Sequence, residues 1–286
     1  MKPSLLWIAV ASLVIQRAVS QEPGRPLRLV PTNNIAAARS KYPLDDHHRI
    51  AQNTPEFEQW GLSFMLSKAN EVREKWKLDI PKPLTVNDVL FQLRATAYGI
   101  DGALETREGR YVFSFERNAF TMLVDTKYWP RSFRYKPEES LRLARTPSQI
   151  TAAEALAIAR EKLHALGMDA RMLRLREPPQ VHQYTFEDHD GTVYPLPIFH
   201  VRWRDQDDQA EGDELPHEPV RFDISGITKN VAKYFNASSH TPREPLPINY
   251  FRMLSLPDNY LDTLDERTRS RLGLAPKGTE KAAKEK

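Results

Sequence analysis

Carboxylate side chains are densest in one segment of the chain, DQDDQAEGDELPHE, at residues 205–218. Counted from Asp207, Glu211, Gly212 and Glu218 fall at the fifth, sixth and twelfth positions of an EF-hand calcium loop. The match is poor, because Glu211 is longer than the usual Asp or Asn ligand and strands rather than helices are expected on both sides. We therefore expect a solvated loop. Weak calcium binding through Asp207, Glu211 and Glu218 is the alternative, and the sequence predicts no other cofactor.

A second group with chemical potential is cationic and lies just before the acidic segment. In IFHVRWR, apolar and basic residues alternate, which is typical of a half-buried strand. This alternation predicts that His200, Arg202 and Arg204 share the open face of a sheet. The three side chains could bind a partner or an anionic ligand, or they could pair with carboxylates on neighbouring strands.

Local signatures of catalysis are absent from the sequence. The chain has no cysteine, no H-E-x-x-H zinc motif, no G-x-S-x-G nucleophile elbow and no glycine-rich phosphate loop. We expect that the protein is not an enzyme. A hydrolase that uses paired carboxylates needs no local motif and stays open as the least favoured alternative.

The segment VRFDISGITKNVAKY, residues 220–234, predicts a β-hairpin. Asp223 is expected to bond backbone N–H groups two residues further on, and Gly226 to adopt a positive φ in the turn. Asp125, in the segment VDTK, is the expected structural counterpart of Asp223 in an earlier hairpin. All three residues are predicted to be structural, with a ligand-contacting carboxylate as the alternative role for Asp223.

Helices and strands are expected in a recurring order. Thr54-Pro55 opens a helix over residues 55–77 whose apolar positions recur at helical spacing. Two T-x-x-D/E capping signals, at Thr85 and Thr151, predict helices over residues 86–98 and 152–166. Strands are expected at 109–116, 120–133, 170–176, 182–187, 197–204 and in the final hairpin.

This order predicts an α+β fold with two similar units, each a helix packed on a curled antiparallel sheet. The predicted boundaries are a signal peptide at 1–20, an extended lead-in at 21–54, a helix plus first unit at 55–140, a second unit at 146–236, a C-terminal extension at 237–275 and a disordered Lys-rich tail at 276–286. The spacing between the caps Thr85 and Thr151 suggests that the two units arose by duplication.

Three stretches resemble PepSY domains, which occur in peptidase propeptides. ITAAEALAIAREKL (150–163) is similar to the opening helix of the family, and YPLPIFHVRWRD (194–205) and EPVRFDISGITKNV (218–231) are similar to its closing strands. The resemblance covers residues 150–235 and, more weakly, 84–136. It implies a cystatin-like fold, no catalytic residues, and a role in binding, inhibiting or chaperoning another protein outside the cytoplasm.

The N-terminus predicts export. Lys2, an apolar run from Leu5 to Ile15 and the small residues Ala18-Val19-Ser20 are typical of a cleaved signal peptide. We therefore expect a secreted or periplasmic protein with no transmembrane segment after cleavage. The formal net charge of +3 falls to +1 when Lys2 and Arg17 leave with the signal peptide, and a chain this balanced has no electrostatic footprint for nucleic acid.

The predicted function is a non-catalytic extracytoplasmic binding module. Its candidate contact residues for another protein are His200, Arg202, Arg204 and Trp129, although Trp129 could instead pack on the core of the first unit. A structural cell-envelope protein and a calcium-dependent adhesion module are the alternatives.

Overall fold

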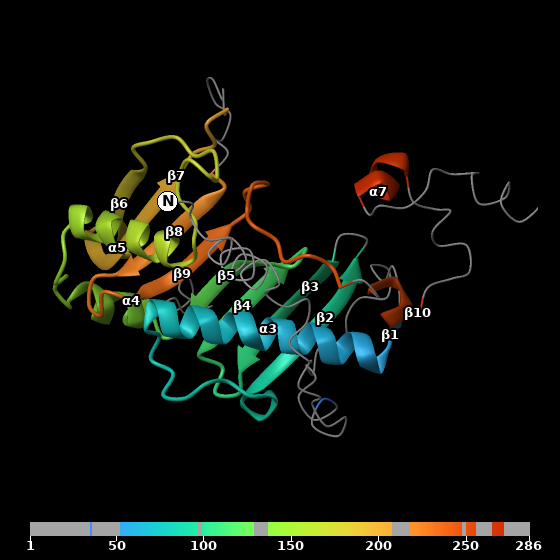
Figure 1. Ribbon diagram of the computed structural model, residues 1–286. Helices are drawn as coiled ribbons and strands as arrows, with labels where there is room; N and C mark the ends of the chain where they lie inside the picture. The colour runs from blue at the N-terminus through green and yellow to red at the C-terminus, as the bar shows by residue number, and fades with distance from the viewer. Residues whose placement is uncertain are drawn as a thin grey trace, which may run out of the picture.

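A computed structural model shows an α+β fold built on one eight-stranded antiparallel sheet (Figure 1). The structure describes residues 35, 52–96, 99–128, 137–207, 218–247, 250–255 and 265–271. The strands of the sheet, in spatial order, are β2 (Val89–Thr96), β3 (Gly99–Thr106), β4 (Tyr111–Glu116), β5 (Ala119–Asp125), β9 (Val231–Asn236), β8 (Val220–Ser225), β7 (Val193–Trp203) and β6 (Gln180–Glu187). A separate two-stranded ladder joins β1 (Gln52–Asn53) to β10 (Leu254–Ser255).

The sheet has two halves that meet at its centre. Helix α3 (Pro55–Trp76) precedes the meander β2–β5, and helix α5 (Ala152–Ala165) precedes the meander β6–β9. The last strands of the two meanders pair antiparallel, with Met122, Leu123 and Val124 opposite Phe235, Tyr234 and Lys233. Each half therefore has a helix followed by four antiparallel strands.

Both long helices begin where the sequence predicts. The Thr54 side chain accepts a hydrogen bond from the Phe57 N–H, and Pro55 occupies the first turn, where its missing N–H costs nothing. Thr151 and Glu154 form a reciprocal capping box at the start of α5. The predicted helices at 55–77 and 152–166 are confirmed.

The predicted helix at 86–98 is wrong. Thr85 and Asp88 do form a capping box, but it opens only the 3-10 turn Val86–Asp88, and strand β2 follows directly. Residues 89–96 alternate between buried and half-buried positions along β2, which is the period of a strand. The helix that precedes the first meander is α3, so Thr54, not Thr85, occupies the position that Thr151 has in the second half.

The strand predictions succeed in part. The segments 109–116, 182–187 and 197–204 and the hairpin at 220–234 overlap β4, β6, β7, β8 and β9. The strand predicted at 120–133 corresponds to β5, which ends at Asp125 and is followed by a turn at 126–128, and its remaining residues lie outside the described part of the chain. Residues 170–176 form turns with a single bridge between Leu175 and Asp205, so the strand predicted there is wrong. Strand β3 has no counterpart in the sequence predictions.

Helices α3 and α5 cover the same face of the sheet, and the main core lies beneath them (Figure 1). Trp76, at the end of α3, is fully buried and packs against Phe120 of the first half and against Phe222 and Tyr234 of the second. Its Nε1–H donates to the Lys162 carbonyl of α5, 2.9 Å away. One side chain thus joins both helices and both halves of the sheet.

The opposite face of the sheet is covered over part of the second half by helix α4 (Pro137–Ala144). Leu196 and Ile198 of β7 are buried, although alternation puts them on the face away from Val201 and Trp203, which lie in the main core. Helix α4 packs on β7 and β6, so we infer that it covers these two residues. His200 and Arg202 lie further along the same face of β7 and are partly exposed.

The C-terminal segment packs against the first half of the sheet. Tyr250 lies in the short helix η3 (Tyr250–Met253), and its hydroxyl lies within hydrogen-bond distance of the carbonyls of Thr96 and Gly99, at 2.8 and 2.7 Å, at the hairpin between β2 and β3. Beyond it, the described residues include the short helix α7 (Glu266–Arg271). The predicted signal peptide, the disordered tail and Trp129 lie outside the described residues. In the described part of the chain, no helix combines the length and the apolar character needed to cross a membrane.

Candidate functional site on the open face of the second half

The predicted cationic residues lie together on the open face of the second half. Strand β7 carries His200 and Arg202, and Arg204 follows its last residue. On one side, β6 places His182 opposite His200 and Gln180 opposite Arg202. On the other side, β8 places Asp223 opposite His200 and Arg221 opposite Arg202.

His200 is fixed by a buried carboxylate. Its Nδ1 lies 2.5 Å from Asp223 Oδ1, and Asp223 is only 3% exposed. The Tyr184 hydroxyl donates to the same carboxylate oxygen at 3.3 Å and lies 3.2 Å from His200 Nδ1. Burial raises the pKa of Tyr184, and the charge of Asp223 raises it further, so the phenol stays a neutral donor. Asp223 and Tyr184 together hold the imidazole in one orientation.

The structure corrects the roles predicted for Asp223 and Gly226. Asp223 lies inside β8 and contacts His200, so it does not bond the turn; the Ser225 hydroxyl accepts from the N–H groups of Ile227 and Thr228 instead. Gly226 has no positive φ. A Cβ added there would lie 2.4 Å from Ser148 Oγ, so close packing rather than backbone conformation favours glycine at this position.

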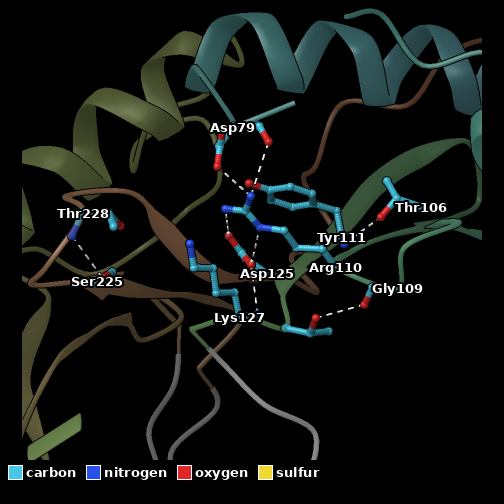
Figure 2. A network of polar contacts seen from close by, with 10 residues as sticks. Asp79, Thr106, Gly109, Arg110, Tyr111, Asp125, Lys127, Ser225 and Thr228 are labelled. Atoms are coloured by element: carbon cyan, nitrogen blue, oxygen red, sulfur yellow. Dashed lines mark hydrogen bonds and ion pairs between the residues drawn. The ribbon is translucent and has the colours of Figure 1, made fainter. Parts of the chain in front are cut away.

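Asp125 occupies a different position from Asp223, at the end of β5 in the first half. It accepts a hydrogen bond from the Lys127 N–H, two residues on, as an Asp in a turn does. Figure 2 shows that Asp125 also forms a bidentate interaction with Arg110, whose Nε and Nη2 each lie 3.2 Å from one of the two carboxylate oxygens. The same guanidinium reaches Asp79 Oδ2 at 2.6 Å. Asp125 therefore belongs to an ion-pair network with Arg110 and Asp79, which is separate from the contacts of His200 with Asp223 and Tyr184.

Two arginines of the open face are also held in place. Arg202 Nη1 lies 2.8 Å from Glu218 Oε1, and Glu218 is mostly buried. The Arg221 guanidinium stacks 4.5 Å above the centre of the Phe235 ring. These contacts reduce the freedom of long side chains before any ligand binds, so a ligand loses less conformational entropy when it associates.

The surroundings of His182 lower its pKa. Partial burial lowers this pKa below 6.5, the electrostatic interactions with Arg202 and His200 lower it further, and Glu218 opposes them. The unfolded chain therefore binds a proton at this position more readily than the folded chain does. The resulting contribution to stability is complete above about pH 6.5 and is lost as the pH falls below it.

We expect the His182→Gln variant to lose less stability than the unmodified chain between pH 7.5 and pH 5, because the group whose pKa is lowered on folding is gone. Urea unfolding at several pH values measures the two slopes. Identical slopes would show that His182 does not contribute to the pH dependence.

The acidic residues predicted to bind calcium are separated by their contacts. Asp207 forms an ion pair with Arg174 at 2.7 Å, whereas Glu218 pairs with Arg202. Glu211 lies outside the described residues. Within the described ranges, no group of three or more His, Asp or Glu side chains is placed to hold a metal ion.

Sequence reasoning missed Tyr184, His182 and Arg176. Tyr184 and His182 lie on β6, and their relation to His200 follows only from the strand register. Arg176 donates its backbone N–H to the Arg204 carbonyl at 2.9 Å, a pairing between two irregular segments. No periodic pattern marks such a pairing, whereas alternation along β7 correctly placed His200 and Arg202 on one face.

Comparison with protein-family models, curated proteins and solved structures finds no match for the chain. The fold defines the class: an α+β protein with one long antiparallel sheet and two helices on one face. The functional assignment therefore rests on the arrangement of the chain's own residues.

Proposed function

We propose that the protein is a non-catalytic binding module that acts outside the cytoplasm and binds another secreted or periplasmic protein. The observation that carries this proposal is the prearranged polar surface of β6, β7 and β8. There His200 is held by Asp223 and Tyr184, and Arg202 is held by Glu218. A surface of fixed charged and aromatic groups favours specific association.

We infer further that the two halves are cystatin-like units related to PepSY domains. The order of one helix and four antiparallel strands in each half supports this assignment. The segments that carry the resemblance supply α5, β7 and β8, and two of these elements, β7 and β8, carry the binding surface. The assignment favours inhibition or chaperoning of a partner over a purely structural role.

Affinity capture with the variant His182→Glu tests the proposed function. His182 is exposed on β6 opposite His200, so the substitution places a negative charge on the binding surface. We expect the unmodified chain to capture a defined protein from the extracytoplasmic fraction of its host, and the variant to bind it about tenfold more weakly or not at all. The matched control is His164→Glu, the same substitution at an exposed position of α5 on the opposite face.

The possible outcomes separate the candidate functions. If both variants lose the partner equally, or both retain it equally, the assignment of the binding site to this surface would be refuted. Loss of the partner in chelator would favour the calcium-dependent adhesion module, and self-association in sedimentation would favour the structural alternative. Hydrolysis that disappears in Asp223→Asn would overturn the non-catalytic assignment.

A further inference from the structure

Three arginines converge on one small hollow beside the His200 cluster. The hollow has a volume of about 170 Å³ and is lined by Arg176, Pro178, Gln180, Arg202 and Arg204. Typical sites for drug-sized ligands are about 300–1,000 Å³, so this hollow suits a small group rather than a large organic ligand. None of the described residues that line it is acidic.

The backbone brings the arginines together from two segments. Residues 174–176 run beside residues 204–206, joined by the bridge of Leu175 with Asp205 and by hydrogen bonds on either side of it. This pairing places Arg176 next to Arg204. Gln180 at the start of β6 is opposite Arg202, so it adds an amide to the same wall.

Two donors of the hollow are left unsatisfied by the part of the chain that the structure describes. Arg202 Nε and Arg204 Nε are both buried and have no hydrogen-bond partner among the described residues. A buried N–H without an acceptor costs free energy, and an acceptor supplied by a ligand would remove that cost.

Among the described residues, two carboxylates are engaged close to the hollow. Glu218 pairs with Arg202, and the nearby Glu177 is engaged elsewhere, by Arg160 at 2.5 Å and by the Trp203 indole N–H at 3.2 Å. Guanidinium groups match the planar or tetrahedral oxygens of carboxylate, phosphate and sulfate, to which they can donate two parallel hydrogen bonds.

We propose that the hollow formed by Arg176, Arg202 and Arg204 is an oxyanion-binding site. Its ligand in the proposed function is a carboxylate of an acidic segment of the partner protein; inorganic phosphate and sulfate share the same chemistry. This inference rests on the proposed function for its biological role, but the site itself can be tested without the partner.

Sulfate is the first probe, because its charge does not change between pH 5 and pH 8. We expect saturable binding to the purified full chain by calorimetry, with shifts of the Arg202 and Arg204 Nε–H signals in nitrogen–proton correlation spectra. Arg204→Gln should weaken binding about tenfold or more, because it removes a charge and the forked donor. Arg204→Lys should recover only part of the affinity, since a lysine keeps the charge without the fork.

The matched control is Arg117→Gln, an exposed arginine in the turn between β4 and β5 of the other half. It should bind sulfate as the unmodified chain does, and melting curves of all variants verify that each one folds. Equal weakening in Arg117→Gln and Arg204→Gln would show nonspecific attraction and overturn the site. Absence of saturable binding, or unmoved Nε–H signals, would also overturn it.

The acidic segment of the chain itself supplies a further control. A variant with Asp208, Glu211, Asp213 and Glu214 changed to their amides should bind sulfate with the affinity of the unmodified chain. If sulfate binds only to this variant, the chain's own carboxylates occupy the hollow, and a site for an external ligand is refuted.

Short peptides identify the source of the oxyanion. A Glu-rich peptide should compete with sulfate, whereas its Gln counterpart should not. If phosphate competes with sulfate and the Glu-rich peptide does not, a carboxylate of a partner protein is not the ligand, and the site binds a free inorganic anion. If sulfate binds but no partner is captured, the proposed function fails while the site stands; if a partner is captured by a chain that binds no sulfate, the site fails and the function stands.

Discussion

Replacing Trp76 by Ala is expected to lower the free energy of unfolding by about 4 kcal/mol, near the upper range for a buried aromatic side chain. The indole is fully buried and packs edge-on against Tyr234, with ring centres 5.2 Å apart, and against Phe120 and Phe222. Its removal leaves a cavity where the two halves meet, and the Lys162 carbonyl loses the hydrogen bond from the indole N–H. Chemical denaturation followed by circular dichroism measures the loss.

Trp76→Phe is the matched control, because it keeps an aromatic ring and removes the Nε1–H donor. We expect Trp76→Phe to lower the free energy of unfolding by less than half as much as Trp76→Ala does. Because Trp76 contacts both halves, the Ala variant should also unfold over a broader denaturant range than the unmodified chain. A sharp transition with a loss below about 1 kcal/mol would contradict the assigned role of Trp76 at the junction.

The second large effect is expected at Arg110, whose replacement by Met should lower the free energy of unfolding by about 3 kcal/mol. The Asp125 side chain is 3% exposed and depends on this guanidinium for its counter-charge. Burial disfavours the charge of Arg110, but hydrogen bonds to Asp125 and Asp79 outweigh that cost and raise its pKa (Figure 2). Without Arg110, the buried carboxylate keeps the Lys127 N–H and the Tyr111 hydroxyl as donors but loses the counter-charge of the guanidinium.

The double variant Arg110→Met, Asp125→Asn tests whether the unpaired charge causes this loss. Asn keeps an oxygen that can accept from the Lys127 N–H and carries no charge, so the double variant should recover most of the stability. Thermal unfolding of the two single variants and the double variant completes the cycle. If the losses of unfolding free energy in the two single variants simply add up in the double variant, Arg110 and Asp125 do not form a direct charge pair.

The sequence predicted the fold best where a signal is local. Thr54-Pro55 and the box of Thr151 with Glu154 identified the two long helices, because a cap is a contact between residues three apart. The same local signal failed at Thr85, where the strand alternation of residues 89–96 outweighed the cap. Tertiary pairing with β3 decided between the two possibilities.

The candidate site was predictable only along single strands. Alternation in β7 placed His200 and Arg202 on one face, but the partners Asp223 and Tyr184 lie on other strands whose register no local pattern determines. Asp223 was therefore assigned to a turn on the basis of its neighbours Ser225 and Gly226. A carboxylate in the middle of a strand faces its cross-strand neighbour, and the identity of that neighbour comes from the fold.

The pairing of β5 with β9 has a consequence for how the chain is made. These strands are far apart in sequence, so closing the central ladder requires a long chain segment to be ordered first. Synthesis from the N-terminus delivers β5 well before β9, and until then β5 is an open edge with Trp76 lacking its partners Phe222 and Tyr234. An open strand edge can pair with other chains. The newly made first half is therefore the stage at which this protein is most prone to aggregate, and the arrival of residues 231–236 ends that stage.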